Sequence, residues 1–261
     1  MLTRRMKLDN PQKNPNERLP QDLSARIWRY MDLSEFVSLL DNRALPFIQA
    51  ANLGDPFEGS ISKPSLDSRP DMMKAIVEEV RLQNPEANPK LTPEWLEAQF
   101  QQLRTTAPYT TMISCWHIGD HESAAMWGLY CRVGDGVAIQ STIQKLAAVL
   151  PDTWNGSGML LSEVSYVDYD TFAVPDGDAI SPFFFKRASF AHEKELRALL
   201  MRPNQPSLVD LVEVDLDSLI EAVYIAPQSP DWYLSVVESL LAKYSLDVPL
   251  RKSRLDDPAL H

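Results

Sequence analysis

Two carboxylates in the stretch Glu193-Lys194-Glu195 are the residues of this chain best suited to do chemistry. Polar and apolar residues alternate from Glu193 to Leu200, which predicts a strand with Glu193, Glu195 and Arg197 on one face. Two carboxylates in register repel each other, so such a pair lies either on a solvated strand face beside cations or in a catalytic cleft. The sequence leaves both interpretations open.

Arg29 and Tyr30 form a second candidate group, on a first strand predicted over residues 25–31. Successive side chains of a strand point to opposite faces, so Arg29 and Tyr30 would face different layers. An arginine is suited to bidentate binding of a phosphate or a carboxylate, which makes Arg29 a candidate ligand-binding residue. The alternative is an ion pair with Asp55 or Glu58, which lie in a turn-rich segment.

Four side chains in one segment are of the types that bind zinc: Cys115, His117, His121 and Cys131. Their spacing matches none of the usual paired zinc motifs, and a helix predicted over 122–131 would carry Cys131 away from the others. We therefore expect no metal. A nucleophilic pair of Cys115 and His117 lacks an evident acid to orient it. The apolar residues of this segment are expected to form core or a pocket wall: Trp116, Met126, Trp127 and Tyr130.

Ser141 and Thr142 lie at the end of another predicted strand, just before a helix. Hydroxyl side chains at such a position cap helices, and they also line clefts. The sequence leaves both roles open for this pair.

Composition and charge restrict the function classes. The chain has 261 residues, a net charge of −11 and a pI of about 4.8, so we expect no nonspecific nucleic-acid binding. Its two cysteines suit a reducing compartment. The charged N-terminus does not have the pattern of a secretory signal, and no apolar run reaches the ~18 residues of a membrane span. We therefore expect a cytoplasmic protein with no membrane partner, and the sequence indicates no particular protein partner.

Most of the chain is predicted to form one domain. Residues 1–22 are rich in Asn, Pro and charge and are expected to be a flexible tail, with a single α+β domain over 23–261. This domain would have a central mixed or antiparallel sheet, flanking helices and a helical insert over about 70–106. Asp32 and Glu35 have the spacing of a capping box at the start of a helix.

Several motifs occur in an order typical of one family: Arg29-Tyr30, Asp55-Pro-Phe-Glu58, Cys115-Trp116, Glu122-Ser123, Met126-Trp127-x-x-Tyr130, Gly136-Val-Ala-Ile139 and Glu193-x-Glu195-x-Arg197. On these motifs the chain resembles the bacterial and phage family called domain of unknown function 2971, over residues 25–254. This resemblance implies no established activity.

The chain is also similar, over shorter stretches, to ADP-ribosyltransferase-like toxins. Arg29, Ser141-Thr142 and Glu193-x-Glu195 stand in the order of the groups that hold NAD in the arginine-modifying branch, although Ile143 replaces the third residue of its Ser-Thr-Ser motif. The resemblance implies that Glu195 stabilises an oxocarbenium-like state, that Glu193 positions the nucleophile, and that Arg29 binds the pyrophosphate.

The same resemblance divides the candidate residues into two groups. The candidate catalytic residues are Glu195, Glu193 and Tyr130. The candidate NAD-binding residues are Arg29, Tyr30, Trp127 and Ser141. Aromatic residues that would stack on the nicotinamide are Tyr130, Trp127 and Phe190. The expected function is an NAD-using transferase or glycohydrolase that acts as a toxin or phage-defence effector. The alternative is a non-catalytic nucleotide-binding or protein-interaction module, in which Arg29 would be salt-bridged.

Overall fold

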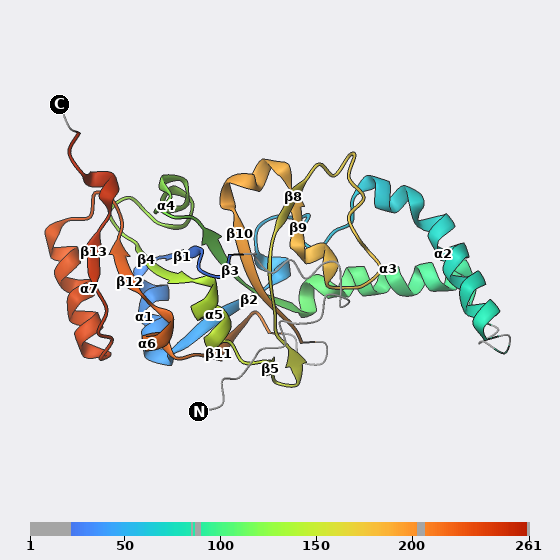
Figure 1. The fold of residues 1–261 in the computed structure, drawn as a ribbon, viewed down its shortest axis with the longest axis horizontal. Coiled ribbons are helices and arrows are strands. Elements are labelled where there is room, and N and C mark those ends of the chain that lie inside the picture. The colour runs from blue at the N-terminus through green and yellow to red at the C-terminus, as the bar shows by residue number, and fades with distance from the viewer. Residues whose placement is uncertain (1–21, 85, 87–89, 203–206, 260–261) are drawn as a thin grey trace.

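Strand β3 (Thr111–Ile118) pairs with three other strands in a central sheet of nine strands (Figure 1). The structure is a computed structural model that describes residues 22–84, 86, 90–202 and 207–259. The other strands of this sheet are β1 (Arg26–Met31), β2 (Ala44–Gln49), β4 (Val137–Thr142), β7 (Leu160–Glu163), β10 (Glu195–Met201), β11 (Val209–Glu213), β12 (Ala222–Ile225) and β13 (Leu250–Lys252). Only β12 and β13 pair in parallel within this sheet, so the predicted α+β fold with a mixed sheet is confirmed.

A fork in the sheet positions the candidate site. β10 pairs with β3 along one side, from Met201↔Thr111 to Glu195↔His117. The other side of β3 is shared, because β1 pairs at Trp28↔His117 and β2 at Ile48↔Ile113. Residues 114–116 of β3 have no strand partner on that side, so β1 and β2 separate around them.

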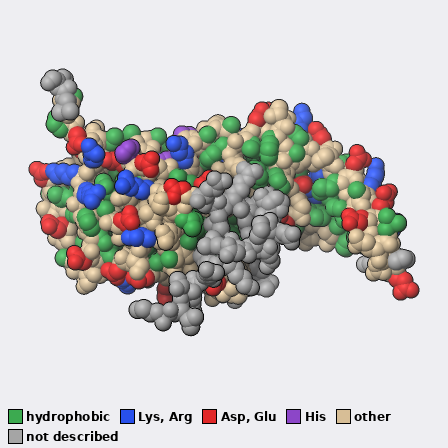
Figure 2. Space-filling model, in the orientation of Figure 1, with side chains coloured by type: hydrophobic (Ala, Val, Ile, Leu, Met, Phe, Trp, Pro, Cys, Tyr) green, Lys and Arg blue, Asp and Glu red, His purple; other side chains and the backbone are tan. Residues whose placement is uncertain are grey.

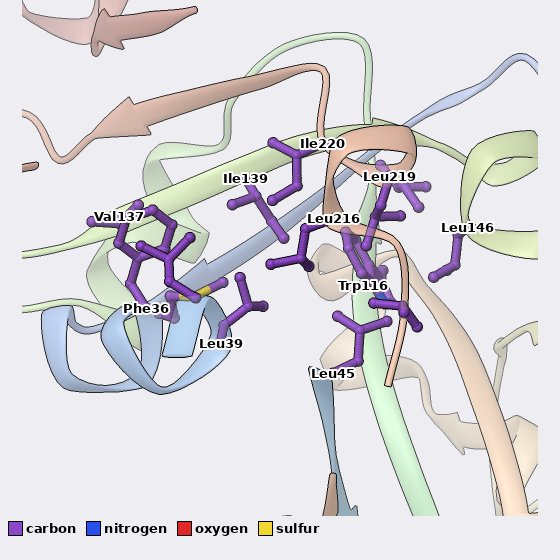
Figure 3. Close-up of a cluster of buried hydrophobic side chains, with 14 of the residues drawn as sticks. Phe36, Leu39, Leu45, Trp116, Val137, Ile139, Leu146, Leu216, Leu219 and Ile220 are labelled. Carbon is purple, nitrogen blue, oxygen red and sulfur yellow. The ribbon is translucent and has the colours of Figure 1, made fainter. Parts of the chain in front are cut away.

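One face of the sheet carries the main core. Helices α1 (Leu33–Asn42), α5 (Ile143–Val149), α6 (Leu216–Leu219) and α7 (Asp231–Lys243) contribute to this core. Figure 3 shows part of it, with Phe36, Leu39 and Trp116 gathered against residues of β4 and α6. The start of α1 is fixed by the predicted capping box, since Asp32 Oδ1 accepts from the Glu35 amide at 2.8 Å and Glu35 Oε2 accepts from the Asp32 amide at 3.1 Å.

The opposite face carries a smaller apolar cluster and the short helix α4 (Ala124–Tyr130). Met126 and Trp127 are the buried residues of α4, and they pack beside Trp28 and Tyr30 of β1. The fork remains accessible beside α4. Farther along the same face, Ile113 and Leu199 pack against Ala50, Ala107 and Phe183. The helix predicted over 122–131 is present as α4, over the slightly shorter range Ala124–Tyr130.

An arm of two helices, α2 (Lys63–Gln83) and α3 (Pro93–Thr110), projects away from the sheet (Figure 1). The predicted insert over 70–106 is helical, and its helices begin earlier and end later than expected. Arg69 holds the base of the arm, because its guanidinium binds Glu97 at 2.7 Å and also binds Asp176. Each helix has a proline in its first turn, where the missing N–H is not needed.

The remaining elements are small. The two-stranded sheets are β5 (Thr153–Trp154) with β6 (Ser157–Gly158), and β8 (Ser165–Val167) with β9 (Phe185–Arg187). The 3-10 helices are η1 (Ala50–Asn52), η2 (Ser181–Phe184), η3 (Ala188–Glu193) and η4 (Arg254–Asp256). Within the described ranges, no helix is both long and apolar enough to cross a membrane. Acidic and basic side chains are interspersed over the visible face (Figure 2). The predicted tail over 1–22 lies outside the described residues except for Asp22.

Candidate functional site

A cavity of about 230 Å³ lies in the fork where β1 and β2 separate along β3. Its walls come from β1, β2, β3, α1, η1 and α4, and β10 contributes its first residue. Polar and aromatic residues in the lining include Arg29, Tyr30, Cys115, His117, Tyr130 and Glu195. The fork thus brings together Arg29, Tyr130 and Glu195, which are far apart in the sequence.

Arg29 enters the fork without a carboxylate partner. Its guanidinium donates to Ser114 Oγ at 2.5 Å and to the carbonyls of Cys115 and Pro46 at 3.4 Å, and all three acceptors are neutral. Among the described residues, no acid forms an ion pair with it. Burial lowers the pKa of Arg29, although an arginine stays protonated at neutral pH. The charge of Glu35, which also lines the cavity, opposes this effect, so Arg29 has an acidic neighbour but no ion pair among the described residues.

Asp55 and Glu58, the candidate partners of Arg29, bind other cations. Asp55 binds Arg187 at 2.7 Å, and Glu58 binds the Arg197 guanidinium with both oxygens, one at 3.0 Å. The expected alternative of an ion pair between Arg29 and either acid is therefore wrong. The turn that carries both acids instead fixes the arginines of β9 and β10.

The predicted strand from Glu193 to Leu200 is wrong at its first two residues. Glu193 is the last residue of η3, and Lys194 adopts a left-handed conformation with φ of 42° before β10 begins at Glu195. The two carboxylates therefore do not alternate along one strand. Neither is on a solvated face, since Glu193 is 7% exposed and Glu195 is 4% exposed.

Both carboxylates belong to a buried ionic cluster. Lys186 Nζ donates to Glu195 Oε1 at 2.8 Å and also to Glu193. Arg197 Nε donates to Glu195 Oε2 at 2.7 Å, and the same guanidinium binds Glu58. Three carboxylates thus share two cations. Full ionisation would leave one uncompensated negative charge in a low-dielectric site, which favours protonation of one member.

Electrostatics separates the two candidate catalytic carboxyls. Burial and a hydrogen bond with Glu195 raise the pKa of Glu193 to about 7. Burial alone would also raise the pKa of Glu195, but Arg197, Glu193 and Lys186 outweigh it and hold this pKa well below its usual range. Glu195 therefore stays ionised at the cavity. Glu193 does not line the cavity and instead binds Lys186.

Aromatic residues form part of the cavity wall. Tyr130 ends α4, lines the cavity and is 48% exposed. Tyr30 also lines it, and its hydroxyl accepts from the Ser123 amide at 2.7 Å. Trp127 packs edge-on against Tyr30, with ring centroids 4.9 Å apart, but is not in the lining. Trp127 therefore supports the wall rather than facing a ligand. Phe190 lies over Lys186, with the ammonium 4.6 Å from the ring centre, and is also outside the lining.

Ser141 does not reach the cavity. It pairs with Ile27 across β1 and β4, and it is fully buried on the core face, where Oγ donates to the Leu219 carbonyl at 2.6 Å. Thr142 caps α5 by accepting from the Lys145 amide at 3.3 Å. The capping role left open by the sequence applies to Thr142, and neither hydroxyl contributes to the fork.

The four candidate metal ligands do not gather at one point. Cys115 and His117 line the cavity, while Cys131 Sγ contacts the Met31 carbonyl at 3.4 Å. His117 Nδ1 is hydrogen-bonded to the Glu193 carbonyl at 2.7 Å, and burial lowers the pKa of this imidazole. Within the described part of the chain, no group of three or more His, Cys, Asp or Glu residues could hold a metal ion.

Sequence reasoning assigned no role to Lys186 or to the pairing of Glu58 with Arg197. The two ends of that pair are 139 residues apart, so no local spacing indicates it. One signal was present: Arg197 follows Glu195 by two residues, which places both on one strand face. Such a face needs compensating charges once it is buried.

Comparisons with known proteins identify no relative. No protein-family model, no curated protein and no solved structure matches the chain. Function is therefore inferred below from the residues in the fork.

Proposed function

We propose that the fork cavity binds an anionic nucleotide, with NAD as the leading candidate, and that the protein is an ADP-ribosyltransferase-like enzyme. The observation that carries this proposal is that Arg29, a cation without an acidic partner among the described residues, shares one cavity with Glu195 and Tyr130. A scaffold role would have paired Arg29 with an acid. Arg29 is half-buried and its hydrogen bonds go to neutral acceptors, so an anionic ligand would compensate its charge better than the protein does.

The size of the cavity limits which part of NAD it would hold. Drug-sized ligands occupy pockets of about 300–1,000 Å³, whereas this cavity is about 230 Å³. It would suit the nicotinamide and its ribose, with the pyrophosphate at Arg29 and the adenosine outside. Tyr130 and Tyr30 offer aromatic surface to the nicotinamide ring.

The chemistry would be cleavage of the bond between nicotinamide and ribose. The bonding electrons leave with the nicotinamide nitrogen, and the ribose passes through an oxocarbenium-like state before water or an acceptor attacks the same carbon and loses a proton. Glu195 would stabilise the positive charge because its low pKa keeps it ionised. Glu193 would position Glu195 through Lys186 rather than contact the nucleophile, which departs from the role expected from sequence.

The non-catalytic alternative also has one observation in its favour. Both oxygens of Glu195 are engaged by Arg197 and Lys186, at 2.7 and 2.8 Å, which leaves less capacity to bind a ribose hydroxyl. In that case Arg29 and the aromatic wall would bind a nucleotide that the protein does not cleave.

Titration calorimetry with NAD and with ADP-ribose, together with a nicotinamide-release assay, separates these two functions. We expect wild-type protein to bind NAD and release nicotinamide. Arg29→Met should weaken binding, whereas Glu195→Gln should stop release and retain binding. Arg26→Met is the matched control, since Arg26 is an exposed arginine at the start of the same strand. Binding without release would favour the non-catalytic module, and absence of both would reject the proposal.

The proposed setting rests on the composition and on the family resemblance. We place the protein in the bacterial cytoplasm, as a member of the family resembled by its motifs, where its two free cysteines would stay reduced. The roles of toxin or phage-defence effector rest on the same resemblance. The net charge of −11 argues against nonspecific nucleic-acid binding.

A further inference from the structure

Glu122 joins the start of α4 to the C-terminal segment of the chain. Its Oε2 atom accepts from Trp127 Nε1 at 2.8 Å and from Ser253 Oγ at 2.6 Å. Its Oε1 atom accepts from the backbone amide of Arg254 at 2.6 Å. These two contacts to the C-terminal segment span 131 and 132 residues of sequence.

The three donors to Glu122 are an indole, a hydroxyl and a backbone amide. None is a cation, and the Arg254 side chain instead pairs with Asp257 at 3.2 Å. Hydrogen bonds to a charged group are stronger than hydrogen bonds between neutral groups. Loss of the negative charge on Glu122 should therefore weaken all three contacts at once.

Helix α4 is short, and Glu122 adds to the packing of Met126 and Trp127 and to the Ser123 hydrogen bond with Tyr30 that also hold it. It has seven residues, fewer than the ~12 at which an isolated helix becomes even marginally stable. Met126 and Trp127 are its only buried residues, and Gly128 lies exposed in its middle. Tyr130, which lines the cavity, is the last residue of this helix, so its position depends on how α4 is held.

We propose that Glu122 is a positioning residue for the ligand site, and that it fixes Tyr130 at the fork cavity by tying α4 to the C-terminal segment at Ser253 and Arg254. The C-terminal segment would thereby affect the cavity although none of its residues lines it. The ligand-binding consequence rests on the proposed function, whereas the ordering of α4 does not.

Hydrogen exchange tests the ordering of α4 without any ligand. Glu122→Gln keeps the shape of the side chain, and Ser253→Ala removes one donor. We expect amide exchange across residues 124–130 to accelerate about tenfold in Glu122→Gln, and less in Ser253→Ala, while β3 and β10 exchange as in wild type. Glu221→Gln is the matched control, because it removes one charge from an ion pair with Lys145 away from α4. Unchanged exchange over 124–130 in Glu122→Gln would overturn the proposal.

Calorimetry with NAD tests whether Glu122 acts through Tyr130. We expect Glu122→Gln and Tyr130→Ala each to weaken NAD about tenfold, and the double variant to be no weaker than Tyr130→Ala alone. A general loss of structure would add to the Tyr130→Ala defect instead, and additive losses would therefore overturn the proposal. If wild-type protein does not bind NAD, the proposed function fails, and the exchange experiment still decides whether Glu122 orders α4.

Discussion

Arg29, which is half-buried, donates a 2.5 Å hydrogen bond to the hydroxyl of Ser114, a neutral acceptor, and forms no ion pair with a carboxylate among the described residues. The free energy of desolvating the guanidinium is therefore only partly recovered within the protein. An anionic ligand would recover more of it, so under the proposed function this one residue would lower stability and raise affinity. The two effects can be measured separately.

Replacement of Arg29 with Met should therefore stabilise the protein while it weakens ligand binding. We expect the free energy of unfolding in urea to stay equal or rise by about 1 kcal/mol, because an incompletely paired charge is removed. Affinity for NAD should fall roughly 10- to 100-fold, which corresponds to about 1.5–3 kcal/mol for one charge-assisted contact. A loss of more than about 1 kcal/mol of stability would instead identify Arg29 as a structural residue.

Charge balance in the buried cluster gives a second prediction. With Glu193 protonated, the charges of Glu58 and Glu195 match those of Lys186 and Arg197. Lys186→Met removes one cation and should destabilise the protein by about 3–5 kcal/mol in urea unfolding. Adding Glu195→Gln restores the balance, so the double variant should recover much of that loss. A double variant no more stable than Lys186→Met would show that charge balance does not govern this cluster.

Glu195→Gln alone should be tolerated for the same reason. Glu193 can ionise and take over as partner of Lys186, so the cluster keeps two anions and two cations. Loss of nicotinamide release in Glu195→Gln could then be assigned to chemistry rather than to unfolding.

The raised pKa of Glu193 gives a prediction with a defined sign. Its folded-state pKa is about 7, against 4.5 for an unperturbed glutamate, so the folded protein retains a proton that the unfolded chain releases between these values. This contribution to stability is fully present below 4.5 and is lost as the pH rises through about 7. We compare wild type with Glu193→Gln by urea unfolding from about pH 4.5 to about pH 8.

The stability of wild type relative to Glu193→Gln should fall as the pH rises through this window. Other groups around Glu193, including Lys186, Glu195, His117, Tyr130 and Tyr166, remain in both proteins, so the comparison largely isolates its titration. A difference that does not change with pH would mean that Glu193 titrates with the same pKa in the folded and unfolded states.

Local patterns predicted those parts of the structure whose causes are local. The capping box at Asp32 and Glu35 and the first strand around Arg29 depend on neighbouring residues, and they occur as expected. The strand proposed from Glu193 failed because Lys194 takes a left-handed conformation, which alternation of residue types cannot reveal. The sequence left open whether Ser141 lines a cleft, and it could not settle this because the face that Ser141 occupies is set by pairing with β1.

In the candidate site, too, the sequence indicated residue types but not the long-range pairing that brings them together. Chemical type was sufficient to select Arg29, Tyr130 and Glu195, which the fork brings to one cavity. The fork itself arises because β1 and β2 pair with opposite ends of β3, and long-range pairing of this kind leaves no periodic signal in one sequence. The pairing of Glu58 with Arg197 is hidden for the same reason.

Gly128→Ala tests whether α4 must be rigid or mobile for binding. A Cβ at this position would meet no heavy atom within 4 Å, and the residue is exposed within the helix. Alanine should therefore stabilise α4 by up to about 1 kcal/mol through helix propensity alone, which hydrogen exchange over residues 124–130 would report. If α4 acts as a fixed wall, Gly128→Ala should leave NAD affinity equal or tighter, and it should partly rescue Glu122→Gln. Weaker binding by Gly128→Ala would mean that α4 has to open before a ligand reaches Tyr130, and Glu122 would then hold the site closed.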